Sequence, residues 1–319
     1  MGKAIKKPAK APSYTSVFGE APLSEARADE RIVAITAAME SGTGLTSFEK
    51  EFPDRFIDVG ICEENAAGMA AGLAIGGRKP VFAVYSTFLQ RAIDQLIVNN
   101  ALMNLDVVFA IDRAGLVGAD GPTHHGMFDL VYTRMVPNMR VLAPSNEAEL
   151  VNSLHTALVL GGPFAVRYPR GEACGVPIPD KPETYEPGVS RLVRDGLDVA
   201  ILAFGNMVAP ANEAAAALEG EGLSVRVVDM RWVKPLDTEA IRRAAETRLV
   251  VTVEDGVVEG GVGEEVLAEL ARQDAKAPVL TLGIPDRYIM QGAPDFLMRE
   301  LGLDAEGIAA AIEEKLEAL

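Results

Sequence analysis

Cysteine is almost absent from this chain of 319 residues, which contains only Cys62 and Cys174. Two cysteines in a protein of this size indicate neither a disulfide framework nor a metal site. They suit a reducing compartment, so we expect the protein to be cytoplasmic or to lie in a comparable compartment such as a plastid. We expect both side chains to be small buried hydrophobes.

Basic residues are also scarce, because 30 Lys and Arg stand against 46 Asp and Glu and the net charge is -16. Such a balance argues against nucleic-acid binding, which requires clustered Lys and Arg to neutralise phosphates. The exception is terminal, where Lys3, Lys6, Lys7 and Lys10 alternate with Ala and Pro. This composition predicts a flexible tail or linker over residues 1–12 rather than a nucleic-acid arm.

Long hydrophobic runs are missing as well. The longest stretch of small apolar residues, 66–75, is too short and too rich in glycine to cross a bilayer. The N-terminus lacks the apolar segment of a secretory signal, so we expect no membrane association. With 49% hydrophobic residues the chain can still bury large cores, and its length suggests two domains.

Short apolar runs alternate with helical patterns over residues 13–177, which predicts a first α/β domain with a mostly parallel sheet flanked by helices. The expected strands are 31–35, 56–61, 80–85, 107–111, 139–143 and 163–168. The expected helices include 63–75, 88–103 and 147–160.

The alternation of apolar runs then stops. Prolines and charged residues accumulate, which predicts a linker over residues 178–189. A second α/β series over 190–319 predicts a second domain of the same class. Its expected strands are 199–203, 225–229, 249–253 and 279–282, with helices that end near 218, begin near 237 and span 263–272. We expect the segment 229–237 around Trp232 to be a strand end that leads into a helix.

The segment 111–126 is the most informative part of the chain. It combines four glycines with Arg113, Asp120, His124 and His125, directly after the buried run 107–111. Open α/β sheets place ligand sites at the C-terminal ends of their strands. Glycines let backbone N–H groups approach an anion, and arginine can bind phosphate or carboxylate with two hydrogen bonds. These features favour a ligand site over a tight surface turn.

Two further segments follow predicted strands, and their residues alone leave two interpretations open. Glu63 opens a helix of very small residues, where an acidic residue is also favoured simply by the helix dipole. The segment 85–95 places aromatic and polar residues where a strand becomes a helix, which can be a site or core packing with a cap.

Taken in order, the motifs 58–66, 85–91, 112–126 and 167–171 closely resemble 1-deoxy-D-xylulose-5-phosphate synthase, one of the transketolase-like thiamine diphosphate enzymes. The resemblance runs from about residue 12 to the end of the chain. It implies a transketolase-like pyrimidine-binding domain followed by a transketolase C-terminal domain. It also implies condensation of pyruvate with glyceraldehyde 3-phosphate and release of carbon dioxide, to give a product used in isoprenoid and thiamine synthesis.

The resemblance assigns roles to seven residues. Glu63 is similar to the catalytic glutamate that contacts the cofactor's aminopyrimidine, and Phe88 to the ring that stacks on that pyrimidine. Arg113 and Arg170 resemble the pair that holds the substrate phosphate. The remaining substrate-side residues, which by the resemblance orient the acceptor aldehyde, are Tyr85, Asp120 and His124. His124 is also similar to a catalytic residue that relays protons.

The chain departs from the family pattern at four positions. The family usually has Gln and His where this chain has Glu64 and Asn65, and commonly His-Asp where it has Val98 and Asn99. The first departure adds a carboxylate beside Glu63. None of the four belongs to the seven residues with assigned roles.

The largest departure is an absent domain. Family members bind the cofactor diphosphate and Mg²⁺ through a Gly-Asp-Gly motif and a later Asn, in a domain that precedes the matched region. Here residues 119–121 with Asn146 imitate that pattern, but the first Gly is missing. We therefore expect no metal ligands in this chain. We expect a subunit or fragment that forms a homodimer and is inactive until a separate chain supplies the diphosphate and Mg²⁺ domain.

Two alternatives remain. The first is a β-type subunit of a two-component transketolase or 2-oxo acid dehydrogenase, which Arg113, Arg170 and the run 120–125 argue against. The second is a non-catalytic regulatory or scaffold subunit. An intact Glu63 together with Phe88 argues against that reading, because a site released from selection should lose such residues first.

Overall fold

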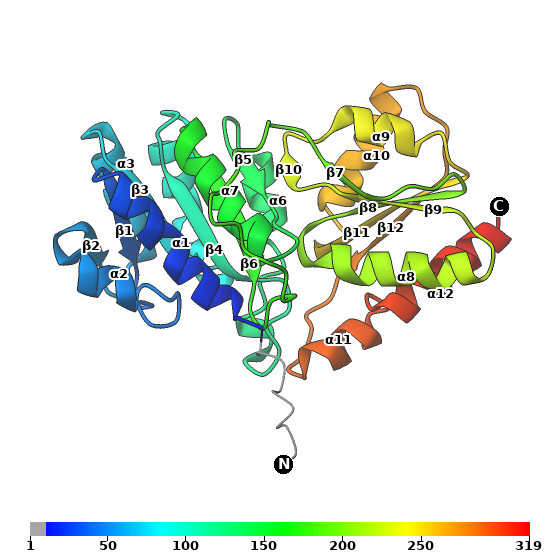
Figure 1. Ribbon diagram of the computed structural model, residues 1–319, viewed down its shortest axis with the longest axis horizontal. Helices are drawn as coiled ribbons and strands as arrows, with labels where there is room; N and C mark the ends of the chain where they lie inside the picture. Colours follow the sequence, from blue (N-terminus) through cyan, green and yellow to red (C-terminus); the bar gives the residue numbers. More distant parts are fainter. Residues whose placement is uncertain (1–10) are drawn as a thin grey trace, which may run out of the picture.

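The computed structural model describes residues 11–319. They form two α/β units that lie side by side, each with its own sheet flanked by helices (Figure 1). The basic residues of the predicted tail, Lys3 to Lys10, lie outside the described residues. The first sheet has seven strands in the order β10-β5-β6-β4-β3-β1-β2. They are β1 (Ile32–Thr36), β2 (Phe56–Asp58), β3 (Lys79–Tyr85), β4 (Val108–Ala114), β5 (Arg140–Leu142), β6 (Phe164–Pro169) and β10 (Trp232–Lys234). All neighbours are parallel except β10 and β5.

Helices cover both faces of this sheet, which explains why its strands are hydrophobic on both sides. In β3, Val81 and Ala83 face one core, while Phe82 and Val84 face the other. The first face carries α1 (Tyr14–Ala28) and α7 (Glu147–Leu160), which lie side by side in Figure 1. The second face carries α3 (Glu63–Ile75) and α6 (Asp129–Met135). Shorter elements are α2 (Thr46–Glu51) and the 3₁₀ turns η1 (Pro53–Arg55) and η4 (Gly121–Thr123).

The single helix expected over 88–103 is wrong, because the chain forms four short pieces there. They are α4 (Ser86–Leu89), the 3₁₀ turn η2 (Gln90–Ala92), α5 (Ile93–Gln95) and the π-helical turn η3 (Leu96–Ala101). The buried amide of Asn100 donates to Gln95 O at 2.8 Å and to Ala67 O on α3 at 3.1 Å. A polar side chain that bonds inward to the preceding turn is compatible with a widened turn rather than a regular helix.

The second sheet has five strands in the order β12-β11-β8-β9-β7, and only β7 is antiparallel to its neighbour. The strands are β7 (Arg191–Arg194), β8 (Val199–Ala203), β9 (Val225–Asp229), β11 (Leu249–Val257) and β12 (Val279–Ile284). The helices are α8 (Val208–Gly220), α9 (Thr238–Ala244), α10 (Val262–Arg272), α11 (Pro294–Glu300) and α12 (Ala305–Glu317), with the 3₁₀ turn η5 (Gly205–Met207). The prediction of two α/β domains with mostly parallel sheets is confirmed.

The two halves interlock through β10. Trp232 pairs with Leu142 of β5, so a strand from the second half completes the first sheet. Its indole is fully buried against Phe164, with ring centroids 6.2 Å apart. The segment around Trp232 is thus a short strand followed by a helix, as expected, although its place in the first sheet was not foreseen.

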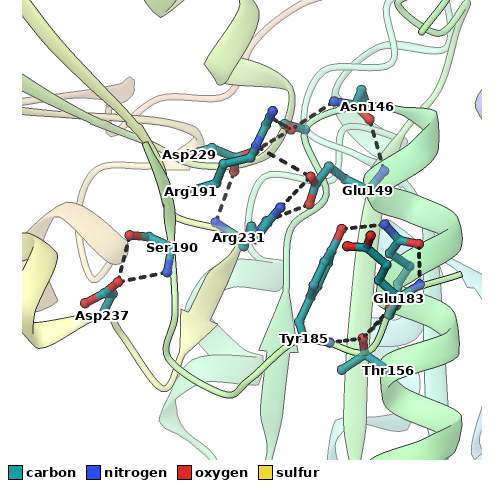
Figure 2. A network of polar contacts seen from close by, with 12 residues as sticks. Asn146, Glu149, Thr156, Glu183, Tyr185, Ser190, Arg191, Asp229, Arg231 and Asp237 are labelled. Atoms are coloured by element: carbon teal, nitrogen blue, oxygen red, sulfur yellow. Dashed lines mark hydrogen bonds and ion pairs between the residues drawn. The ribbon is translucent and has the colours of Figure 1, made fainter. Parts of the chain in front are cut away.

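Charged groups join the halves beside this strand (Figure 2). Glu149 of α7 accepts two hydrogen bonds from the Arg231 guanidinium, each at 2.8 Å. The buried carboxylate of Asp229 accepts from Ser145 Oγ at 2.7 Å and from Arg191 Nη2 at 2.9 Å. These paired and hydrogen-bonded charges fix the linker end and β9 against the first domain.

The two cysteines correct a prediction, because both side chains are exposed and free. Cys62 lies in the turn before α3, and Cys174 follows β6. The backbone at Cys174 is anchored, since the Glu147 carboxylate accepts from Cys174 N at 3.1 Å and from Gly175 N at 2.7 Å, and the Cys174 sulfur lies 3.9 Å from the Tyr14 hydroxyl. Within residues 11–319, no helix combines the length and apolar character needed to cross a membrane.

Candidate active site

The predicted site residues follow the C-terminal ends of parallel strands in the first sheet. Glu63 comes after β2, Tyr85 ends β3, Arg113 lies near the end of β4, and Arg170 follows β6 directly. Because these strands are parallel neighbours, their C-terminal ends meet at one edge. A series of contacts, which includes Arg91, connects all seven predicted residues there.

Glu63 is the first residue of α3 and is buried. Its Oε1 accepts a hydrogen bond from Arg91 Nη1 at 2.6 Å. Its Oε2 is buried and has no hydrogen-bond partner among the described residues. A buried carboxylate oxygen normally has a partner, so this atom is available to a ligand donor. The neighbouring departures from the family pattern, Glu64 and Asn65, are exposed.

Three rings form a platform next to this glutamate. Phe88 stacks on Tyr85, with ring centroids 5.6 Å apart, and meets the His124 ring edge to face at 5.5 Å. The guanidinium of Arg91 lies 4.8 Å from the Phe88 centroid and so connects the platform to Glu63. His124 Nδ1 is 2.9 Å from Thr123 Oγ1. The platform therefore carries a partly exposed aromatic ring and an imidazole beside a buried carboxylate.

Two arginines converge on Asp120 at the other end of the platform. Arg170 Nη1 donates to Asp120 Oδ2 at 2.7 Å, and Arg113 Nη1 lies 4.0 Å from the same oxygen. The Arg113 guanidinium also lies over the Tyr85 ring, 3.7 Å from its centroid. Arg113 has φ +61°, which is unfavourable for a residue with a side chain. Strain at that residue is consistent with a backbone shaped for ligand contact.

A buried carboxyl group lies behind these arginines. Asp112 is fully buried, and its Oδ2 accepts from Thr15 Oγ1 at 3.4 Å while Oδ1 has no partner among residues 11–319. Burial raises the pKa of the Asp112 carboxyl to about 7, and the nearby Arg113 charge opposes this rise. The buried hydroxyl of Tyr168 likewise has no partner in the described protein.

The family resemblance gives no role to Arg91 or Asp112. Arg91 lies three residues after Phe88 within a quoted motif, and that spacing places both side chains on one side of a helical turn. Asp112 continues a strongly apolar strand, so a carboxyl group at that position has to be buried. Both signals are visible in the sequence.

Residues 119–121 and Asn146 do not form a metal centre. Asp120 is engaged by the arginines, and the Asn146 side chain caps α7 by accepting from Glu149 N at 3.0 Å. Over the described range 11–319, no group of three or more His, Cys, Asp or Glu residues is placed to hold a metal ion.

Comparison with known families defines the class of this protein. The model of the transketolase pyrimidine-binding domain matches residues 10–175, and that of the transketolase C-terminal domain matches residues 188–308. The chain therefore belongs to the transketolase family.

Its curated relatives narrow the similarity. The chain is 53% identical over 305 residues to the 1-deoxy-D-xylulose-5-phosphate synthase of Chlorobium luteolum, covering 95% of this chain and 48% of that protein. It is 52% identical over 317 residues to the enzyme of the same name from Aquifex aeolicus, covering 99% of this chain and 50% of that protein. The chain thus spans about half the length of the curated relatives it matches.

Solved structures agree with this similarity. A split-gene transketolase, described as an inactive β4 tetramer, is 33% identical with a TM-score of 0.83, and the match covers 95% of this chain and 98% of that chain. The Campylobacter jejuni transketolase shares the fold, with a TM-score of 0.81 at 20% identity over 97% of this chain and 47% of that chain.

Proposed function

We propose that this chain is the pyrimidine-side half of a thiamine-diphosphate-dependent 1-deoxy-D-xylulose-5-phosphate synthase. In this proposal it condenses pyruvate with glyceraldehyde 3-phosphate and releases carbon dioxide, for isoprenoid and thiamine synthesis. The observation that carries the proposal is the convergence of Arg113 and Arg170 beside the ring platform, where a phosphorylated acceptor can be held. The identities of 52 to 53% to synthases of that name support the same conclusion.

The residues present fit the aminopyrimidine of the cofactor. Glu63 Oε2 is a buried oxygen without a partner in the described chain, and Phe88 offers a partly exposed ring close by. When bound, thiamine diphosphate supplies the carbon nucleophile and electron sink of the reaction. Glu63 then holds a proton at the pyrimidine N1′, with Arg91 fixing its other oxygen.

The remaining residues act on the substrates. Arg113 and Arg170 bind the phosphate with planar, permanently charged groups. Tyr85 and Asp120 orient the acceptor aldehyde, and His124 moves a proton at its carbonyl oxygen. We place the diphosphate and Mg²⁺ ligands on a separate chain or segment, and we expect a homodimer that is inactive without it. The free thiols suit the cytoplasm.

The two arginines provide the test. The chain is combined with the unmatched half of the Aquifex aeolicus relative, and either arginine is replaced by Ala. We expect use of glyceraldehyde 3-phosphate to weaken by about 1.5–3 kcal/mol, the scale of a hydrogen bond to a charged group. Consumption of pyruvate in the first half-reaction should change far less, because pyruvate has no phosphate. Lysine should recover only part of the loss.

Equal damage to both half-reactions, or none to either, would mean that the arginines serve the fold or an interface. One alternative has its own support, since the split-gene transketolase is matched over 98% of its length. That reading, a β-type subunit of a two-component transketolase, predicts that the combined enzyme accepts ketose phosphates as donors and does not release carbon dioxide from pyruvate.

A further inference from the structure

The loop that carries Asp120 and His124 packs against the second domain as well as the first. We call residues 115–126 the substrate-side loop. Leu116 within it and Met127 just after it are buried in the same hydrophobic cluster as Ile289 and Leu297 of the second half. The cluster is the core formed by α8, α12 and the second sheet. The loop therefore contributes side chains to the core of the other domain.

Glycines seat this loop directly on the backbone of the segment before α11. Gly118 has φ +89°, and a Cβ there would lie 2.9 Å from both Gly292 O and Pro294 Cδ. Gly292 N lies 3.4 Å from Gly118 O, to which it donates. Gly121 has φ +73°, and a Cβ there would lie 3.3 Å from Gln291 Cβ. A side chain on Gly118 would push the loop away from the second domain.

The buried imidazole of His125 connects the same two segments. Its Nδ1 accepts from Val117 N at 3.1 Å, and its Nε2 lies 3.4 Å from Met290 O. Burial lowers the pKa of His125, so the ring is neutral near pH 7. A neutral ring that accepts at Nδ1 carries its proton on Nε2, where it donates to the Met290 carbonyl. The His125 ring thus bonds to the second domain, whereas the ring of its neighbour His124 meets Phe88.

The start of the loop packs against a buried ion pair between the domains. A Cβ on Gly115 would overlap Asp255 Oδ2 of β11. Asp255 pairs with Arg167 of β6, and Arg167 Nε also donates to Asp129 Oδ2 at 2.8 Å. All three charged side chains are buried. The start of the loop, its glycines at 118 and 121, and His125 therefore all lie against groups supplied by the second domain.

We propose that the second domain is a positioning element of the site: through His125, Gly118 and residues 289–292 it holds the substrate-side loop so that His124 stays against Phe88. His125 is accordingly a positioning residue and makes no contact with substrate. The proposal goes beyond the proposed reaction and concerns only the geometry of the loop. The second domain would position this loop whichever acceptor substrate the enzyme uses.

The chain has three histidines, so imidazole NMR on the whole chain gives a direct measurement. The assignments come from replacing His124, His125 and His155 one at a time. The Phe88 ring, 5.5 Å from His124, shifts the His124 ring signals, and Phe88→Leu defines the spectrum without that contact. We expect Gly118→Ala and His125→Ala to move the His124 signals to their Phe88→Leu position while the protein stays folded.

Two variants separate positioning from general damage. Gly222 also has positive φ, +95°, but a Cβ there meets no atom within 4 Å, so Gly222→Ala carries the backbone strain without the clash. We expect that variant to leave the His124 signals unchanged. His125→Gln should restore them, since its amide can accept from Val117 N and donate to Met290 O. Unchanged His124 signals in folded Gly118→Ala and His125→Ala proteins would overturn the proposal.

A measurement on the unaltered chain covers the case in which those variants fail to fold. Amide hydrogen exchange is followed at rising urea for peptides from 115–126, from β11 and from β3. We expect the loop to lose protection together with β11, because the second domain holds it. Loss of protection in step with β3 alone, while β11 stays protected, would contradict the proposal.

Discussion

Glu63 is buried with one oxygen paired to Arg91 and the other without a partner in the described chain. Leaving a buried polar atom unpaired costs about 1–3 kcal/mol. Some groups of the site pair with one another, as Arg170 does with Asp120, whereas Asp112 Oδ1 and the Tyr168 hydroxyl are also buried without a partner in the described chain. The free oxygen of Glu63, which lies beside the Phe88 platform, is therefore prepared for a donor that arrives with a ligand.

Replacing this residue tests its proposed proton-holding role. In the enzyme combined with a diphosphate-binding half, we expect Glu63→Gln to keep the fold and to slow hydrogen exchange at the cofactor C2 roughly 10²- to 10⁴-fold, the scale of a lost acid–base group. The exchange rate is followed by NMR. Glu64→Gln is the matched control, because Glu64 is adjacent but exposed, and it should exchange at the normal rate. Equal exchange rates in Glu63→Gln and in the unaltered enzyme would show that another residue holds the proton.

Asp112 predicts how stability depends on pH. Its folded pKa of about 7 lies above the ordinary value near 4, so the folded state binds the proton more tightly. This favourable contribution is complete at low pH and is lost as the pH rises from about 4 through 7.

We therefore expect the free energy of unfolding of Asp112→Asn, relative to that of the unaltered chain, to increase from pH 5 to pH 8. The increase is at most about 1.4 kcal/mol for each unit of the pKa shift that falls in this interval. Urea unfolding at both pH values measures the difference. Asp286→Asn, at an exposed position, is the control and should show no such trend. A constant difference between the two proteins would mean that the Asp112 carboxyl keeps an ordinary pKa.

At the level of single residues the sequence was informative about clusters and uninformative about burial. The glycine-rich run with Arg113 and Asp120 was visible as a candidate ligand site, and the structure joins those residues by direct contacts. The burial expected for Cys62 and Cys174 was wrong, because average residue preferences do not say that these positions fall in connecting segments. The functional roles themselves remain predictions.

Among the elements, the central strands were the easiest to predict. A strand covered on both faces is a continuous apolar run, as in β8 and in residues 108–111 of β4, and its position follows from composition alone. The segment between β3 and β4 was harder, because its apolar spacing suits one helix while Asn100 is a buried polar residue. Local periodicity does not reveal that Asn100 bonds to Gln95 and to α3.

Asn100 is therefore expected to hold the π-helical turn in place. Asn100→Ala removes hydrogen bonds of 2.8 and 3.1 Å and leaves the carbonyls of Gln95 and Ala67 without this donor. We expect a loss of about 1–3 kcal/mol in the free energy of unfolding, measured with urea. Asn99→Ala, at a partly exposed neighbour, should cost much less. Equal costs would show that the turn does not depend on the buried amide.

For the whole molecule, composition and the proline-rich break predicted two domains but not their interlocking. The strand β10 has three residues and pairs with β5, which lies about ninety residues earlier in the chain. No local pattern identifies such a partner, because a short antiparallel edge strand carries little periodicity. The buried contact between Arg167 of β6 and Asp255 of β11 is equally remote in sequence. Both links follow from packing of the complete chain.

Arg167 predicts that the two domains depend on each other for stability. Its guanidinium neutralises two buried carboxylates, Asp129 and Asp255, from different halves of the molecule. Arg167→Met keeps most of the side-chain volume but leaves both acids uncompensated, and breaking a buried pair in this way typically costs about 3–5 kcal/mol. We expect the unfolding curves from far-ultraviolet circular dichroism and from the single tryptophan, Trp232, to shift together to lower urea.

The exposed pair Arg27 and Glu51 supplies the control, since Arg27→Met breaks a solvent-screened pair and should shift the curves far less. Lowering the pH should return part of the stability lost in Arg167→Met, because burial raises the pKa of Asp129 and the acid becomes neutral. A loss that does not change with pH would point to poor packing of the methionine instead. A shift of only one of the two probes would mean that the domains unfold independently and that Arg167 does not couple them.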